Sequence, residues 1–204
     1  MRYGFLGLCF LGAILFASAG SQASIIQFDL RGNAGTGLLG GNENPAVVTT
    51  GTGGETGLGI SFDDAVGSKV LTLNVGWGTI NNFTNISGLA TGFHIHQAGS
   101  SAFTANGGVI IDFLPGGATL TNTLNGGGLT NHTVTLSASQ EAALLAGQLY
   151  LNVHTALNGG GEIRGNLVAV PEPTSLCLLG LTITGFTFRR AIRKKFASKV
   201  QSNA

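Results

Sequence analysis

The central part of this sequence has little positive charge. The whole chain has 204 residues, with ten Lys and Arg against nine Asp and Glu. Seven of the ten basic residues lie near the two ends, at Arg2 and after residue 188. Between residues 24 and 173, three basic residues stand against nine acidic ones, a net charge of −6. A domain with so few cations lacks the basic surface by which proteins bind nucleic acid.

Cysteine is equally scarce. The two cysteines, Cys9 and Cys177, both lie in the terminal segments. The region between them can therefore form no internal disulfide and offers no thiol for catalysis. It also has a single lysine, Lys69, and no Gly-x-Ser-x-Gly motif, so covalent catalysis lacks an evident nucleophile. We expect a protein that is not an enzyme.

The first 23 residues have the pattern of a secretory signal peptide. Arg2 precedes an apolar stretch that is short for a membrane span and ends in small residues. Ala-Ser-Ala at 17–19 and Ser-Gln-Ala at 21–23 both fit a cleavage site. We predict cleavage after Ala23, because a strand-like segment follows. An uncleaved N-terminal anchor is the alternative.

The C-terminal segment, 170–204, has three parts in order. Pro171, Glu172 and Pro173 are followed by an apolar run at 176–188 and then by a basic cluster. A helix of that run spans about 20 Å, short of the roughly 30 Å hydrocarbon core. The basic flank favours a cytoplasmic C-terminus for this short transmembrane segment. A plain membrane anchor is the alternative to a sorting signal.

This tripartite tail resembles the PEP-CTERM sorting signal of Gram-negative bacteria that make exopolysaccharide. The resemblance implies recognition by an exosortase, cleavage near the Pro-Glu-Pro motif, and transient anchoring in the inner membrane. It also implies delivery to the cell surface or the extracellular matrix, where exopolysaccharide and matrix components are candidate partners.

Residues 24–169 read as one β domain. Short β-prone runs separated by Gly and Asn predict an all-β sandwich or barrel. We expect strands at 25–31, 57–62, 69–76, 87–96, 107–113, 132–136, 148–154 and 162–169. The segments at 50–57, 63–67, 99–107 and 157–161 are expected to be turns or loops. One short helix is expected after Ser137, which has capping-box spacing to Gln140, with Gly147 at its C-terminal end.

Two of the four histidines lie two positions apart in "GFHIHQAGS". Strand periodicity places His94 and His96 on one face. In "QLYLNVHT", it places Asn152 and His154 on the polar face. If the two faces stay consistent, Asn152 pairs with Arg164 and His154 with Glu162 across a long loop.

These residues predict a candidate metal site. His94, His96 and His154 could bind copper or zinc if their nitrogens lay within roughly 3–4 Å of one another. Glu162 is expected to orient an outer ring nitrogen, and Arg164 to form a cross-strand ion pair with Glu162. The alternative is that the histidines are hydrogen-bonded polar residues without a metal. Sequence alone does not fix whether His154 reaches the pair.

Three segments carry a family resemblance. "FDLRGNAGTGLLGGNENP", "FHIHQAG" and "GQLYLNVHTALNGGGEIRGNL" resemble the CHRD domain over roughly residues 25–168. The family's usual proline is missing from the loop after "NVHT", and Gln97-Ala98-Gly99 replaces the usual Gly-Pro-Ala. The resemblance implies an immunoglobulin-like β architecture and a binding or structural role in an exported protein.

The segment "GFHIHQAG" is also similar to the copper-binding strand of copper/zinc superoxide dismutases, whose fold is a Greek-key β-barrel. In that comparison His94 and His96 match two copper ligands, and His154 could match a third. The bridging histidine, the zinc aspartate and the structural cysteine pair have no counterpart here. This resemblance implies an alternative, a copper- or zinc-binding protein related to a dismutase-like barrel but without dismutase activity.

Overall fold

The computed structural model describes residues 24–65, 67–114 and 120–171. The predicted signal peptide and the tail from Glu172 onward lie outside these ranges. The described residues form strands β1 (Ile25–Gly32), β2 (Gly35–Thr36), β3 (Leu38–Leu39), β4 (Thr52–Asp63), β5 (Val70–Trp77), β6 (Ala90–Ala98), β7 (Gly107–Asp112), β8 (Leu120–Thr123), β9 (Gly126–Thr135), β10 (Leu149–Thr155) and β11 (Ile163–Ala169). The helices are α1 (Ala138–Leu145) and the 3-10 turns η1 (Gly40–Asn42) and η2 (Thr79–Asn81).

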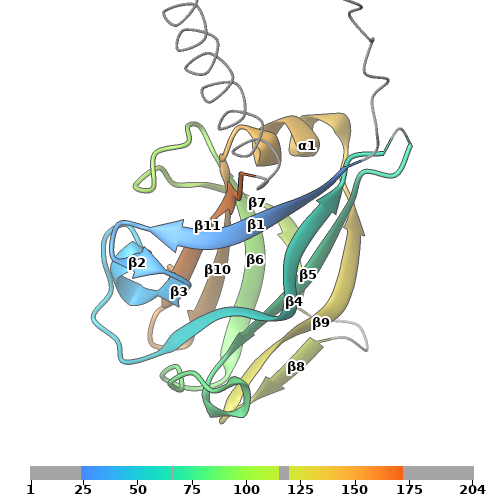
Figure 1. The fold of residues 1–204 in the computed structure, drawn as a ribbon. Coiled ribbons are helices and arrows are strands. Elements are labelled where there is room, and N and C mark those ends of the chain that lie inside the picture. Colours follow the sequence, from blue (N-terminus) through green and yellow to red (C-terminus); the bar gives the residue numbers. More distant parts are fainter. Residues whose placement is uncertain (1–23, 66, 115–119, 172–204) are drawn as a thin grey trace, which may run out of the picture.

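All eleven strands belong to one antiparallel sheet (Figure 1). Its order is β7-β6-β10-β11-β1-β4-β5-β9-β8, with the short strands β2 and β3 beside this path. The first and last strands of the domain are neighbours, since Phe28 of β1 pairs with Ala169 of β11. The all-β prediction with one short helix is confirmed.

The sheet curls around one apolar core. Phe93 on β6 meets Trp77 on β5, with ring centroids 5.1 Å apart, although four strands separate β6 from β5 in the sheet order. The apolar residues of β10 that were expected to face inward, Leu149, Leu151 and Val153, are fully buried in this core. Alternation along each strand places apolar side chains on the concave side of the sheet.

The polar face of β10 and β11 is buried. Tyr150 and Asn152 are only 3% exposed and Arg164 is 0% exposed. Two segments cover this face: Asn42 donates to the Arg164 carbonyl at 3.1 Å, and Arg164 donates to Asn106 at 2.7 Å. The histidines therefore lie beside a buried polar layer.

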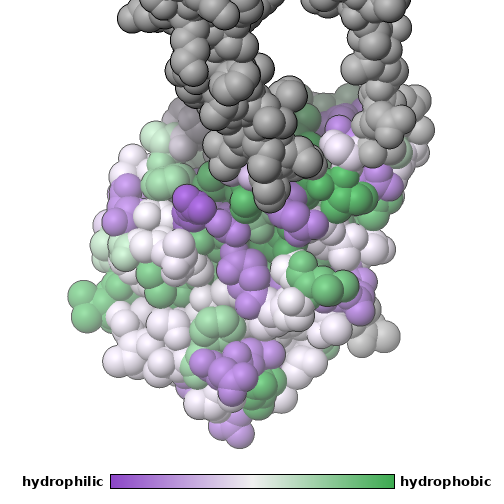
Figure 2. Space-filling model, viewed as in Figure 1, coloured by the Kyte–Doolittle hydropathy of each residue, from purple (hydrophilic) through white to green (hydrophobic). Residues whose placement is uncertain are grey.

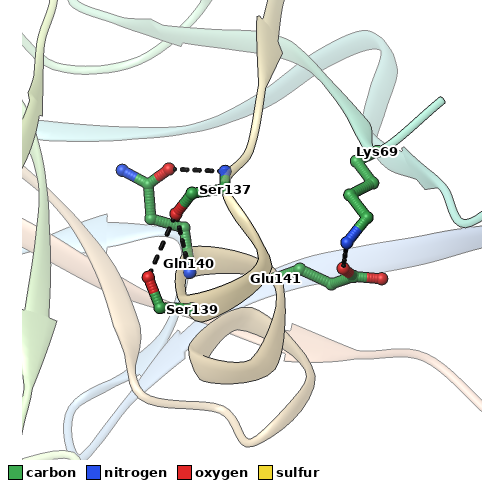
Figure 3. Close-up of polar contacts among 5 residues, drawn as sticks. All are labelled: Lys69, Ser137, Ser139, Gln140 and Glu141. Carbon is green, nitrogen blue, oxygen red and sulfur yellow. Dashed lines mark hydrogen bonds and ion pairs between the residues drawn. The ribbon is translucent and has the colours of Figure 1, made fainter. Parts of the chain in front are cut away.

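Helix α1 begins as its sequence predicts (Figure 3). The Ser137 hydroxyl accepts from the Gln140 backbone N–H, and the Gln140 side chain accepts from the Ser137 backbone N–H. Gly147 follows the helix with a φ of 68°, a left-handed conformation that suits glycine. Lys69 lies 2.5 Å from Glu141, which links the helix to the start of β5.

The eight predicted strands are present, but the prediction of a loop at 50–57 is wrong. Most of that segment belongs to β4, where Gly53 pairs with Trp77. A Cβ at Gly53 would lie 2.6 Å from the Gly76 carbonyl and 3.1 Å from the Trp77 Cβ. Glycine is therefore needed where β4 packs closely against β5, and its low β propensity is overridden.

The turn at 63–67 is present and is fixed by its two aspartates. The Asp63 carboxylate accepts from the Ala65 N–H at 3.0 Å and from the Ser68 hydroxyl at 2.8 Å. The Asp64 carboxylate accepts from the Ser24 backbone N–H at 2.7 Å and from its hydroxyl at 3.2 Å. Both carboxylates are thus used within the protein.

The surface shown in Figure 2 is largely pale, with separated hydrophilic and hydrophobic areas. This agrees with a composition rich in Gly, Thr, Ser and Asn. Among the described residues, no helix is long and apolar enough to span a membrane. The apolar run at 176–188 lies outside the described residues.

Candidate metal centre

Three histidines meet on one face of the sheet. Strands β6 and β10 pair so that His94 lies opposite Asn152 and His154 lies opposite Gly92. Because side chains alternate along a strand, His94, His96 and His154 all project to the same side. The sheet order makes β6 and β10 neighbours, which the sequence did not fix.

The three imidazole rings form a compact cluster. Ring centroids are 4.8 Å apart for His94 and His154, 5.5 Å for His94 and His96, and 5.8 Å for His96 and His154. One ring nitrogen from each residue lies within 4.8 Å of the other two. This separation is wider than the expected 3–4 Å, and ring movements of about 1 Å would close it to copper or zinc distances.

Each histidine has one ring nitrogen held by the protein. His96 Nδ1 donates to the Gly107 carbonyl at 3.1 Å, and His154 Nδ1 donates to the Gly159 carbonyl at 3.0 Å. His94 Nε2 lies 3.3 Å from Asp112 Oδ1. Carbonyls and carboxylates of this kind orient the rings of metal-binding histidines and fix their tautomers.

The other nitrogen of each ring is buried and lacks a partner among the described residues. These atoms are His94 Nδ1, His96 Nε2 and His154 Nε2. Buried ring nitrogens normally have a hydrogen-bond partner, because leaving one unpaired costs about 1–3 kcal/mol. Three such atoms in one cluster are what a site for a bound cation provides. The assignment of a metal to these residues stays a prediction.

Burial favours the neutral forms of His94 and His96. Burial lowers the pKa of His94, the nearby His154 lowers it further, and Asp112 opposes both. Burial also lowers the pKa of His96, against the effect of the Gly107 hydrogen bond. A neutral imidazole has the free lone pair that metal binding requires.

Glu162 does not orient a histidine, so that prediction is wrong. Its carboxylate accepts from Thr49 at 2.6 Å, from Thr155 at 2.7 Å and from the Ser87 N–H at 2.9 Å. Burial by itself would raise the pKa of Glu162, but these hydrogen bonds outweigh it and lower the pKa. The residue ties two loops to the end of β10 and lies apart from the imidazole cluster.

The ion pair predicted between Glu162 and Arg164 is also wrong. The predicted pairing of Asn152 with Arg164 is confirmed. However, the Arg164 guanidinium donates to the side chains of Asn106 and Asn166 and to a backbone carbonyl. The Glu162 carboxylate instead accepts hydrogen bonds from the hydroxyls of Thr49, Ser87 and Thr155. Thr49 and Ser87 are distant from Glu162 in sequence, so only the tertiary fold brings them to it.

Asn152 contacts an acid that the sequence did not single out. Its Nδ2 donates to Glu43 Oε2 at 3.4 Å. Burial raises the pKa of Glu43 to about 7, although the charge of Arg164 and the Asn152 hydrogen bond lower it. The remaining oxygens, Glu43 Oε1 and Asn152 Oδ1, are buried without partners among the described residues.

Other residues of the cluster were missed from the sequence. Asp112 lies opposite His94 on β7, and Gly92 leaves room for two of the rings. Polar alternation in the hairpin formed by β6 and β7 could have indicated Asp112. The backbone carbonyls of Gly107 and Gly159 carry no signal in residue type.

The sequence matches two protein-family models. The CHRD domain model matches residues 35–167, and the PEP-CTERM protein-sorting motif matches residues 169–194. No curated protein matches the chain, and no solved structure does. The sorting motif implies export to the cell surface and processing by an exosortase. The CHRD match covers more than half of the 204 residues, and the chain therefore belongs to the CHRD domain family.

Proposed function

We propose that this CHRD protein is a non-catalytic, metal-binding component of the bacterial cell surface or extracellular matrix. His94, His96 and His154 would hold one copper or zinc ion. Three imidazoles suit both metals, so the residues alone do not choose between them. Cleavage by the exosortase near Pro171 would release the domain from the inner membrane.

One observation carries the metal assignment. Each of the three histidines has its outer nitrogen held by a carbonyl or carboxylate, and its inner nitrogen buried without a partner among the described residues. If the histidines were only hydrogen-bonded polar residues, their buried nitrogens would be expected to have protein partners as well. This pattern favours the metal-binding alternative over a purely structural role.

The charges around the cluster are mixed, because the carboxylate of Asp112 favours a bound cation and the positive charge of Arg164 near His96 opposes it. Asp112 brings a carboxylate to His94. Of the three cations in the described part of the chain, Arg31 pairs with Asp29, Lys69 pairs with Glu141, and Arg164 is buried. Surface cations speed the capture of anionic substrates, and this site has none of the three free for that role.

Metal titration of the full chain, purified in detergent and stripped with a chelator, tests the proposal. We expect one copper or zinc ion per chain. At a hundredfold excess over the dissociation constant, binding should add about 3 kcal/mol to the free energy of unfolding. The melting temperature should then rise by roughly 5–10 °C.

The histidine variants give matched controls. His96→Ala should remove most of the metal-dependent rise in melting temperature and leave the metal-free protein folded. His132→Ala removes the fourth described histidine, which lies against Phe113 and outside the cluster, and should keep the rise. Equal melting of the wild type with copper, with zinc and with chelator would refute a metal site.

A further inference from the structure

Next to the imidazole cluster, three side chains stack in a row. The strand order β6-β10-β11 places Tyr150 between His96 on one neighbouring strand and Arg164 on the other. The His96 and Tyr150 rings have centroids 4.8 Å apart and an interplanar angle of 9°. The guanidinium carbon of Arg164 lies 3.6 Å from the centroid of the Tyr150 ring. A guanidinium over an aromatic face is an attractive contact, and the stack fixes the plane of the His96 ring.

Arg164 also fixes the loop before β7. Its Nη2 donates to the Ala105 carbonyl and its Nη1 to Asn106 Oδ1, both at 2.7 Å. With the bond from Nε to Asn166 Oδ1, each of the three nitrogens of this guanidinium donates a hydrogen bond, and the residue is 0% exposed. Transferring a cation from water into the protein is costly unless it keeps its hydrogen-bond partners. Arg164 therefore holds Ala105 and Asn106 in place.

Tyr150 holds the next residue of the same loop. The Tyr150 hydroxyl accepts from the Gly107 N–H at 3.1 Å and donates to the Gly107 carbonyl at 3.3 Å. The same carbonyl accepts from His96 Nδ1. The hydrogen bond made by one imidazole nitrogen decides which tautomer is present, and so which nitrogen is free to bind a metal.

We propose that Arg164 and Tyr150 are positioning residues for His96. They hold the Gly107 carbonyl where it keeps a proton on His96 Nδ1 and leaves Nε2 free for the ion. The role as a metal ligand rests on the proposed function, whereas the control of the His96 tautomer does not. The effect is confined to His96, because the outer nitrogens of His94 and His154 have other partners.

Two conservative variants of the full chain test this assignment. Tyr150→Phe keeps the ring and removes the hydroxyl. Arg164→Lys keeps the charge and removes the planar group that reaches the loop. Nitrogen NMR of the metal-free protein at pH 8 should find His96 with its proton on Nδ1 in the wild type and as a mixture of tautomers in both variants.

Copper binding gives the second readout. Both variants should bind copper about tenfold or more weakly than the wild type, the loss typical when a partner of a metal-binding histidine is removed. The electron paramagnetic resonance spectrum of the Cu(II) complex should also change. Arg31→Lys alters a surface cation that pairs with Asp29 and should change neither the tautomer nor the affinity.

The outcomes separate the two proposals. If the wild type binds no metal but the His96 tautomer shifts in the variants, the proposed function fails and the positioning role stands. If the variants keep both the wild-type tautomer and the wild-type copper affinity, the positioning role is overturned. Should Arg164→Lys not fold, Tyr150→Phe decides alone, because it removes a single oxygen atom.

Discussion

Among single residues, Gly92 shows how the cluster depends on a missing side chain. It lies opposite His154 and two positions before His94. A Cβ at this position would lie 2.6 Å from His94 Cε1 and 3.2 Å from His154 Cδ2. Both contacts are with side-chain atoms, so a larger residue would displace the rings before it disturbed the sheet.

We predict that Gly92→Ala weakens metal binding more than it weakens the fold. The new methyl group should displace the His94 ring from the position in which it would bind the metal. Copper or zinc affinity should fall about tenfold, as with other changes that disturb the orientation of a metal ligand. The metal-free protein should keep nearly the wild-type melting temperature. Gly99→Ala is the matched control, because a Cβ there meets nothing within 4 Å. Unchanged affinity in Gly92→Ala would contradict the prediction.

Glu43 makes the stability of the domain depend on pH. It is 9% exposed, and burial raises its pKa to about 7. The unfolded chain has the ordinary value near 4.5, so the folded protein retains a proton that the unfolded chain releases. The stabilisation is complete below about pH 4.5 and is lost as pH rises through about 7.

We predict that Glu43→Gln removes this dependence. Glutamine resembles the protonated acid and does not titrate, so the two proteins should be similarly stable at pH 5. At pH 8 the wild type should be less stable than the variant by on the order of 2–3 kcal/mol. Denaturant unfolding at both pH values measures the difference. A difference between the two proteins that does not change with pH would contradict the raised pKa.

At the level of elements, local signals predicted more than long-range ones. The capping box of α1 and the pairing of Asn152 with Arg164 are both confirmed, because each depends on a short stretch of chain. The Gly-rich start of β4 was misread, because its strand conformation depends on packing against Trp77. The short strands β2, β3 and β8 were not predicted, because they have too few residues to show the alternation typical of a strand.

We predict that Ser137→Ala lowers the free energy of unfolding by about 1 kcal/mol. The change leaves the Gln140 backbone N–H without its cap, which is the usual cost of losing such a residue. Thermal unfolding by circular dichroism measures the loss. Ser101→Ala, at an exposed loop position, should leave the melting temperature unchanged. An equal loss in both variants would show that the cap is not the cause.

For the molecule as a whole, the histidine face was predictable and the histidine cluster was not. Strand periodicity alone puts His94 and His96 on one side. Bringing His154 beside them requires β6 and β10 to be neighbours. These strands begin at Ala90 and Leu149, 59 residues apart, and only the fold places them side by side. The segments that cover the polar face of β10 and β11 are likewise distant in sequence, so the sequence did not predict that this face is buried.

The chain ends also concern the whole molecule. Strands β1 and β11 pair, so both ends of the domain leave it from neighbouring strands. We predict that replacing Pro171, Glu172 and Pro173 by alanine keeps the precursor in the inner membrane, because the exosortase would lose its recognition motif. Cell fractionation and immunoblotting measure the location. Release of the variant at the wild-type level would contradict a role for this motif.

The contact between Ser24 and Asp64 would change its nature if the predicted signal peptide were cleaved after Ala23. Before cleavage, the Ser24 nitrogen is an amide, and its bond to the carboxylate has a neutral donor. The predicted cleavage after Ala23 would convert that nitrogen into a terminal ammonium group, and the same bond would become charge-assisted and stronger. The new N-terminus would then be bound to the turn between β4 and β5 as soon as it formed. Maturation itself would tighten the edge of the domain from which the leader has been cut.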